Sequence, residues 1–320
     1  MSFIPKNQLH VDKHLSNVAI NFSRSGTFAD KIAPIVPVNK QTDLIKVFSQ
    51  ADMWRIDNTV RAPGNEANRV SVSVSSLSYV AKNYALRADI TAEDKANADA
   101  GFVRTLEEGR VITLKDKLDM DWDRRVAVQV TNTSNVGCSA NVGSSWTDLT
   151  NSDPYSDINT QIDNIEDGTG YRPNRMVIGG EAFRYLARNN NIIDKTKETA
   201  LTGASTNTTA GRIADLFELD QITVARSYFN TAQEGQALAL SRVFDPHVLL
   251  YYAPERPSIE TPSFMYSFRW NVAGIPSMQA QRLPYDRARQ SEGIQVSYYQ
   301  DEVITGASFG ALVANVTSSQ

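Results

Sequence analysis

Three short motifs contain side-chain types that could do chemistry, and the first is a serine between glycines. Residues 306–310, with the sequence GASFG, have the Gly-x-Ser-x-Gly form of the turn that exposes the nucleophile of α/β-hydrolases. In that fold the catalytic histidine follows the serine in the chain. Here His10, His14 and His247 all precede Ser308. The order of residues therefore disfavours a serine hydrolase, which is kept as an alternative from another class of function.

The second motif is a set of alternating aspartates. Asp119, Asp121 and Asp123 copy the opening of a calcium loop, in which alternate positions supply carboxylate ligands. The sixth position of that loop requires glycine and the twelfth requires glutamate, but this sequence has Arg124 and Val130 there. We therefore interpret the aspartates as a solvated helix face that pairs with the adjacent arginines.

Two further patterns for metals or phosphates are incomplete. His10 and His14 have the four-residue spacing of zinc ligands on a helix, but no third ligand accompanies them. No glycine-rich segment ends in Gly-Lys-Ser/Thr, so the sequence lacks the phosphate-binding P-loop. The sequence thus predicts no catalytic residues, no metal site and no cofactor, and we expect that the chain is not an enzyme.

The composition is that of an ordinary folded protein. Apolar residues make up 41% and charged residues 21% of the 320 residues, which disfavours disordered, collagen-like and membrane classes. A single core stops growing at roughly 250–300 residues, so we expect two linked sub-domains. The formal net charge is −4 and no Lys/Arg-rich run occurs, so the signature of a protein that grips nucleic acid is missing.

The sequence also bears on the cellular compartment. Cys138 is the only cysteine, which excludes a disulfide framework within one chain and fits a reducing compartment. The first residues lack a basic stretch followed by an apolar run, and no segment approaches the ~20 apolar residues of a membrane span. We expect neither export nor contact with a membrane.

Residues 1–38 show no sustained periodicity, yet they carry many apolar side chains. Phe3, Ile4, Leu9 and Phe22 are among them. Terminal segments this apolar are rarely left in water. The segment either folds over its own core or forms an arm on a neighbouring subunit, and we favour the arm.

A hairpin is predicted next. Residues 44–48 are typical of one strand, and residues 70–75 alternate strictly between apolar and polar, as a half-buried strand does. The polar tip between them has its turn at 62–64 and carries three arginines and three carboxylates: Arg55, Arg61, Arg69, Asp52, Asp57 and Glu66. A two-stranded ribbon is marginal in water by itself, so this one must lie against something else. An ordinary hairpin within a larger sheet is the alternative.

A long helix follows the hairpin. Thr91 begins a Ser/Thr-x-x-acid capping motif, and from about residue 102 to residue 130 apolar residues recur every three or four positions. The stripe consists of Val111, Leu114, Leu118, Trp122, Val126 and Val130. A helix of this length spans on the order of 43 Å and can brace an elongated molecule. Gly109 interrupts the pattern, which makes a bend there plausible.

The remaining chain predicts a mixed unit and then closing strands. Asp153 can cap a helix with Pro154 in its first turn and Ile158, Ile162 and Ile165 on its apolar face. A buried strand at 176–178 precedes a helix through residues 183–186, and another helix ends near residue 217. Strands are expected at 247–252, 264–270, 294–299 and 309–316. The fold class is therefore α+β.

Five segments, in this order, resemble a family of shell-forming proteins. They are residues 28–38 (FADKIAPIVPV), 61–64 (RAPG), 172–183 (RPNRMVIGGEAF), 251–254 (YYAP) and 262–264 (PSF). Together with the order of arm, hairpin, long helix, mixed unit and closing strands, they are similar to the major capsid proteins of tailed bacteriophages. The resemblance implies the Hong-Kong-ninety-seven-like capsid fold.

The resemblance also implies a division of the chain. An N-terminal arm would occupy residues 1–38 and an extended loop residues 39–80. A peripheral domain with the long spine helix would occupy residues 81–150, an axial domain residues 151–245, and strands returning to the peripheral domain residues 246–320. Since the arm starts almost at the first residue, we expect any scaffolding to come from a separate protein.

As function, the resemblance implies self-assembly into homo-hexamers and homo-pentamers of an icosahedral head that encloses double-stranded DNA without sequence-specific binding. Expected partners are a scaffolding protein, a portal and cement proteins, with assembly in the bacterial cytoplasm and residence in the virion. An encapsulin-like nanocompartment shell is the alternative within the same fold. Subunit contacts would come from the loop tip, through Arg55, Arg61, Pro63, Gly64, Glu66 and Arg69, and from the arm, through Phe3, Ile4, Leu9 and Phe22.

Overall fold

The computed structural model describes residues 12–22, 24, 26–48, 52, 54–61, 63–64, 66–71, 73–98, 102–199, 210–258, 261–271 and 278–317. Its helices are α1 (Lys13–Asn21), α2 (Ala29–Ile32), α4 (Ala92–Asn97), α5 (Phe102–Val130), α6 (Pro154–Thr169), α7 (Gly180–Arg188), α8 (Asn190–Thr199) and α9 (Ala210–Phe217). Short 3-10 turns lie at Thr133–Asn135 and Ala307–Phe309. Within the described residues, no helix combines the length and the apolar character that a membrane span needs.

The strands form two five-stranded sheets and two separate hairpins. We call the first the long sheet; it contains β1 (Ile35–Val38), β11 (Met265–Trp270), β13 (Ser291–Ile304), β12 (Gln279–Arg282) and β4 (Lys82–Thr91). The upper sheet has the order β5 (Cys138–Asn141), β14 (Gly310–Ala314), β10 (Val248–Tyr251), β6 (Arg175–Gly179) and β7 (Gln221–Ala225). The hairpins are β2 (Thr42–Phe48) with β3 (Val74–Val80), and β8 (Tyr228–Asn230) with β9 (Leu240–Arg242).

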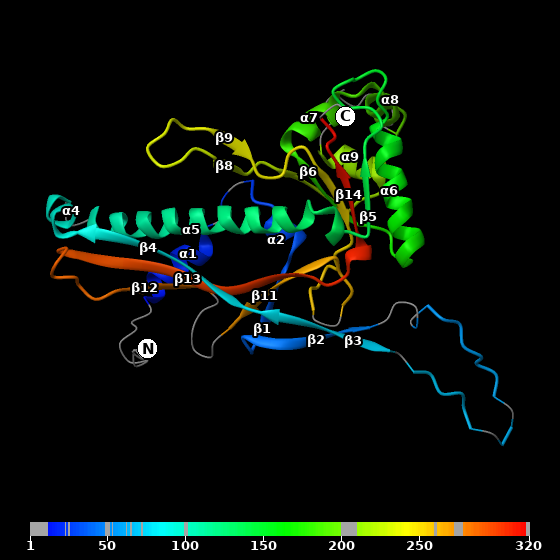
Figure 1. The fold of residues 1–320 in the computed structure, drawn as a ribbon, viewed down its shortest axis with the longest axis horizontal. Coiled ribbons are helices and arrows are strands. Elements are labelled where there is room, and N and C mark those ends of the chain that lie inside the picture. The colour runs from blue at the N-terminus through cyan, green and yellow to red at the C-terminus, as the bar shows by residue number, and fades with distance from the viewer. Residues whose placement is uncertain are drawn as a thin grey trace.

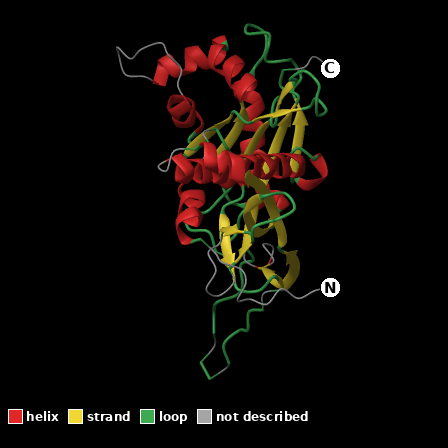
Figure 2. Ribbon diagram, turned by 90° about the vertical axis from the view of Figure 1, so that its left-hand side faces the viewer, coloured by secondary structure: helices red, strands yellow, loops and turns green. Residues whose placement is uncertain are grey.

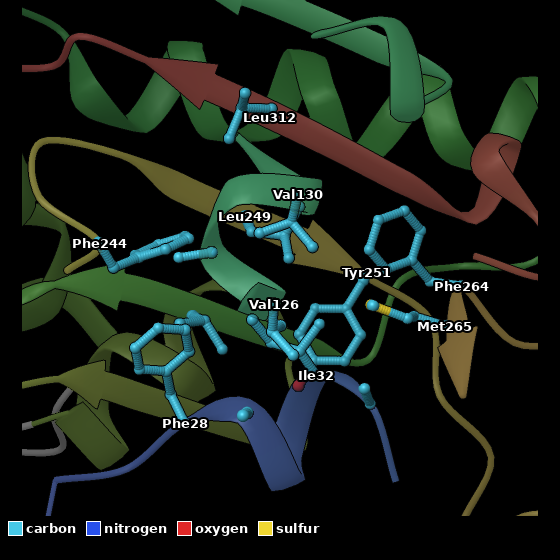
Figure 3. Packing of buried hydrophobic residues seen from close by; sticks show 14 of the residues in the cluster. Phe28, Ile32, Val126, Val130, Phe244, Leu249, Tyr251, Phe264, Met265 and Leu312 are labelled. Carbon is cyan, nitrogen blue, oxygen red and sulfur yellow. The ribbon is translucent and has the colours of Figure 1, made fainter. Parts of the chain in front are cut away.

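The long helix α5 lies along the long sheet and reaches the upper sheet at its C-terminal end (Figure 1). The stripe predicted from the sequence is buried in full, and the helix continues through Gly109 without interruption. The N-terminal half of the stripe packs with α1, β12 and β13. The C-terminal half packs with the chain around α2 and with the upper sheet; Figure 3 shows Ile32 close to Val126 and Tyr251, with Phe28 beside Phe244.

The upper sheet carries α6 to α9, which gather around its strands in Figure 2. The predicted cap of α6 is confirmed, because the Asp153 side chain accepts a hydrogen bond from the Ser156 N–H and Pro154 occupies the first turn. The three isoleucines of the predicted apolar face are buried. Thr91 likewise caps α4, accepting from the Asp94 N–H. These local patterns were sufficient because each depends on residues within one turn.

One predicted strand has other bounds in the structure, and the closing strands divide between the two sheets. The strand expected at 70–75 begins only at Val74, because β3 pairs with β2 and that partner ends at Phe48, which lies opposite Val74. The closing strands do not all lie in one sheet: β10 and β14 pair with each other and with β6 and β5 in the upper sheet. Only β11, β12 and β13 join the long sheet.

Candidate subunit-contact surfaces

The β2–β3 hairpin is attached to the long sheet at its base. Ile45 and Tyr79 are buried there with Val36, Val38, Tyr266 and Phe268, and the rings of Tyr79 and Phe268 stack with centroids 5.1 Å apart. The Val80 N–H donates to the Asp301 carboxylate at 2.8 Å. The hairpin therefore leaves the body of the molecule from a packed root.

Beyond the root, the chain projects from the molecule (Figure 1). Residues 54–61 and 66–71 are exposed, including the apolar side chains Trp54, Ile56, Val60 and Val70. Ile56 is 98% exposed and Val60 is 78% exposed. Apolar side chains grouped on a projecting loop are typical of a protein contact surface.

The two limbs of this loop are joined by hydrogen bonds. The Ser73 N–H donates to the Asp52 carboxylate at 2.9 Å, and the Ser73 hydroxyl donates to the same group. These hydrogen bonds, that of the hydroxyl first, lower the pKa of Asp52. Further out, the Asn68 side-chain amide donates to the Asn58 carbonyl at 2.6 Å. Among its described residues, the loop is thus a ribbon joined by side-chain hydrogen bonds and not by a ladder of paired strands.

The predicted tip residues lie on this ribbon, and the turn is where the sequence placed it. Pro63 and Gly64 form the turn, and Gly64 has a φ of +87°, a left-handed conformation that favours glycine. Arg55 pairs with Asp52 at 3.4 Å on the limb before the turn. Arg69 pairs with Glu66 at 3.5 Å on the limb after it. Arg61 is exposed. Pairing of these charges between subunits stays a prediction.

The predicted arm divides at residue 12. Phe3, Ile4 and Leu9 lie outside the described residues. From residue 12 onward the segment folds over its own core: Leu15 and Ala19 of α1 are buried against α5, β12 and β13. Residues 12–22 therefore fold over the core of their own subunit, which was the first of the two alternatives. Phe22, the fourth expected arm residue, is half-buried at the end of α1, and its N–H donates to the Val18 carbonyl.

The chain after α1 is held by a buried carboxylate. Asp123 of α5 accepts hydrogen bonds from the Phe28 N–H at 3.1 Å and the Ala29 N–H at 3.0 Å, and its other oxygen accepts from the Ser227 hydroxyl. Burial, opposed by these hydrogen bonds, raises the pKa of Asp123. One side chain thus joins α5, the segment before β1 and the base of the β8–β9 hairpin.

The solvated-face interpretation of the aspartates was therefore wrong for two of the three. Asp119 is buried beside Lys115, and burial raises its pKa. Asp123 is buried among hydrogen-bond donors, whereas Asp121 is exposed and pairs with Arg125. The sequence could not show this, because the helix packs against other chain segments on two sides. Within the part of the chain that the structure describes, no group of acidic, histidine or cysteine side chains could hold a metal ion.

Ser308 and the two described histidines were the remaining candidates for chemistry. Ser308 is exposed in the 3-10 turn before β14 and does not sit on a strand-to-helix turn. Of the two described histidines, His247 accepts from the Asn315 N–H through Nδ1, and His14 lies 3.7 Å from Glu108. Neither arrangement matches a hydrolase site.

Trp54 is the contact residue that sequence reasoning missed. Its indole lies over Gly170 at the C-terminal end of α6 and edge-on to the Tyr171 ring, with centroids 5.7 Å apart. The available indication was an aromatic residue beside a loop tip that carries several charged side chains. Its contact with Gly170 could not be predicted, because the two residues are more than 100 positions apart in the sequence.

In sequence, the chain is similar to phage capsid proteins. The sequence model of the family described as Phage major capsid protein E matches residues 82–237. The chain is 25% identical over 242 residues to the major capsid protein of Pseudomonas phage JBD67, covering 76% of this chain and 77% of that protein. It is also 25% identical over 269 residues to the major capsid protein of Burkholderia phage BcepMu, covering 81% and 83%.

Solved structures share the fold. A phage-related protein from Bordetella bronchiseptica RB50 superimposes with a TM-score of 0.75 at 22% identity, over 97% of this chain and 98% of that one. The capsid structure of the cyanophage P-SCSP1u gives a TM-score of 0.58 at 9% identity, over 98% and 92%. A virus-like particle from Pyrococcus furiosus gives 0.54 at 11% identity, over 94% and 98%.

Proposed function

We propose that this chain is the major capsid protein of a tailed phage with the Hong-Kong-ninety-seven-like fold. In this proposal its copies assemble through the β2–β3 loop into hexamers and pentamers of an icosahedral head. The observation that carries the proposal is the projecting ribbon formed by residues 54–61 and 66–71, in which Ile56 is 98% and Val60 78% exposed. A ribbon without supporting strands is marginal in water, so a neighbouring copy is the surface that would cover it.

The domain division is part of the proposal and takes the sheet pairing into account. We assign residues 39–80 to the extended loop, and the long sheet with α1, α4 and α5 to the peripheral domain. The axial domain then comprises the upper sheet and α6 to α9. This assignment moves β10 and β14 from the peripheral to the axial domain, because their partners are β6 and β5. Residues before 12 remain the candidate arm.

The partners that we propose are those that a closed protein shell around DNA requires. Copies of the chain would meet one another at every lattice contact, while a portal, a separate scaffolding protein and cement proteins would join during assembly in the bacterial cytoplasm. Double-stranded DNA would be enclosed without sequence-specific binding. The modest negative charge of the chain supports enclosure over tight binding.

Electron microscopy of the purified full-length protein tests this function. We expect closed shells of uniform diameter, and particles isolated from the native host should contain double-stranded DNA. Particles filled with a protein cargo would instead identify a nanocompartment. A protein that stays monomeric at all concentrations and salt conditions would overturn self-assembly. Comparing wild type with Ser308→Ala in a hydrolase screen addresses the enzymatic alternative, for which no difference is expected.

A further inference from the structure

Just beyond its root, the loop contacts the upper half of its own subunit through Trp54. Figure 1 places the end of α6 beside the point at which the loop leaves β2 and β3. There the Trp54 indole covers Gly170, so closely that a Cβ built on this glycine would lie 3.0 Å from the Cε2 and Cζ2 atoms of Trp54. The bare backbone of a glycine is what allows the ring to approach.

Gly170 and Tyr171, which we call the platform, lie under Trp54 and are held by a helix cap and by ring contacts. Gly170 ends α6 in the left-handed conformation, with a φ of +71°, and its N–H donates to the Glu166 carbonyl at 2.7 Å. Tyr171, whose ring Trp54 meets edge-on, lies against the rings of Tyr252 and Phe309 with centroid distances of 5.2 and 5.7 Å. Trp54 therefore rests on a helix end that is fastened to the core of the upper sheet.

We infer that Trp54 is an intramolecular latch, which fixes the direction in which the loop leaves its subunit and so presents Ile56 and Val60 to a second copy. Trp54 lies near the start of the projecting chain, and Ile56 follows after one residue. Its side chain keeps 58% exposure while it contacts the platform, whereas Ile56 is exposed almost completely. The inference rests on the proposed function for the identity of the partner, but the latch itself is a property of the free subunit.

The latch lowers the cost of association. A loop that samples many directions must be ordered when it binds, whereas a loop held in one direction has lost that freedom beforehand. An aromatic contact of this kind can shift an open–closed equilibrium by roughly fivefold. The expected consequence is faster shell formation from latched subunits.

The latch can be measured in dissociated subunits, before any assembly. A fluorophore on Glu66→Cys, in a Cys138→Ala background, reports loop motion through its anisotropy decay. We expect Trp54→Ala to increase the amplitude of fast loop motion, Trp54→Phe to restore most of the wild-type decay, and the matched control Ile56→Ala to leave the decay unchanged. Thermal unfolding of each variant should match wild type, because both side chains are largely exposed.

Assembly followed by light scattering completes the test. We expect Trp54→Ala to slow shell formation several-fold, with Trp54→Phe close to wild type. An anisotropy decay that is the same in Trp54→Ala and Ile56→Ala would overturn the latch, even if shells form poorly. Absence of shells from wild type would overturn the proposed function alone, since the anisotropy comparison does not depend on assembly.

Discussion

Arg125 of α5 donates a hydrogen bond to Glu302 of β13, with 2.8 Å between Nη2 and Oε1. The guanidinium also reaches the Tyr298 hydroxyl at 3.3 Å and lies over the Tyr84 ring. Burial, opposed by the nearby positive charge of Arg125, raises the pKa of Tyr298 to about 12. The C-terminal part of the long helix is thus held to the long sheet by a charged contact.

Removing Arg125 should destabilise the subunit strongly, because Glu302 would remain buried without its cation. We expect Arg125→Met to lower the free energy of unfolding by about 3 kcal/mol. The matched control is Arg172→Met, which removes an exposed arginine paired with Glu166 at 3.2 Å and should cost about 1 kcal/mol or less. Urea unfolding of dissociated subunits measures both, and equal losses would contradict a special role for the α5–β13 contact.

Asp123 should make stability depend on pH in a defined direction. Its pKa in the folded protein is raised above the ordinary value of 3.8, so the folded state binds the proton more tightly than the unfolded state. The contribution of Asp123 to the free energy of unfolding is therefore largest at pH values below 3.8. This contribution is lost as the pH rises through the pKa of the folded state. Asp123→Asn carries no charge, although its amide can still accept from Phe28 and Ala29.

We therefore expect the unfolding free energy of wild type, minus that of Asp123→Asn, to fall as the pH rises from about 4. Above the folded pKa the difference should become constant. Urea titrations of both proteins at matched pH values measure it, and groups common to both proteins cancel. A difference that rises over this pH range would show that the pKa of Asp123 is lowered instead.

The loop tip should matter to assembly and little to folding. Arg61, Pro63 and Gly64 are all exposed, and a Cβ built on Gly64 would meet no atom within 4 Å. We expect Arg61→Glu combined with Pro63→Gly to leave the unfolding temperature of dissociated subunits nearly unchanged while reducing shell yield or lowering particle melting temperature, since small losses repeat at every contact. Equal losses in subunit and shell would argue against a contact between copies.

The arm experiment suggested by the sequence needs a new boundary. Deleting residues 1–21 would remove α1 and with it buried Leu15 and Ala19, so a loss of folding would confuse the result. We expect deletion of residues 1–11 to preserve the unfolding midpoint but reduce shell yield. Leu15→Ala should instead lower the unfolding free energy by about 3 kcal/mol. Normal shells from the shorter deletion would exclude an assembly role for these residues.

Free subunits should bind DNA weakly. The net charge of −4 and the lack of a basic run leave few cations to displace counterions from phosphates. Fluorescence titration of labelled duplex DNA should give weak binding with a shallow salt dependence. Sub-micromolar affinity in physiological salt would contradict this expectation.

Local patterns made much of the fold predictable from sequence alone. The bounds of α5 follow from a stripe that repeats at helical spacing, and the caps Thr91 and Asp153 act on N–H groups of their own first turn. The Pro63–Gly64 turn likewise depends on the conformations of two adjacent residues. The sequence also supported the capsid resemblance, through the order of its motifs.

Tertiary structure decided what joins distant segments. The same apolar strand pattern fits either sheet, so only the packed fold shows that β10 and β14 belong to the upper one. Asp123 looks like a surface aspartate until the backbone of Phe28 and the Ser227 hydroxyl close over it. Trp54 gains its partner only when Gly170 ends a helix more than 100 residues later. Such contacts depend on how chain segments meet in space, and residue spacing along the chain does not record that.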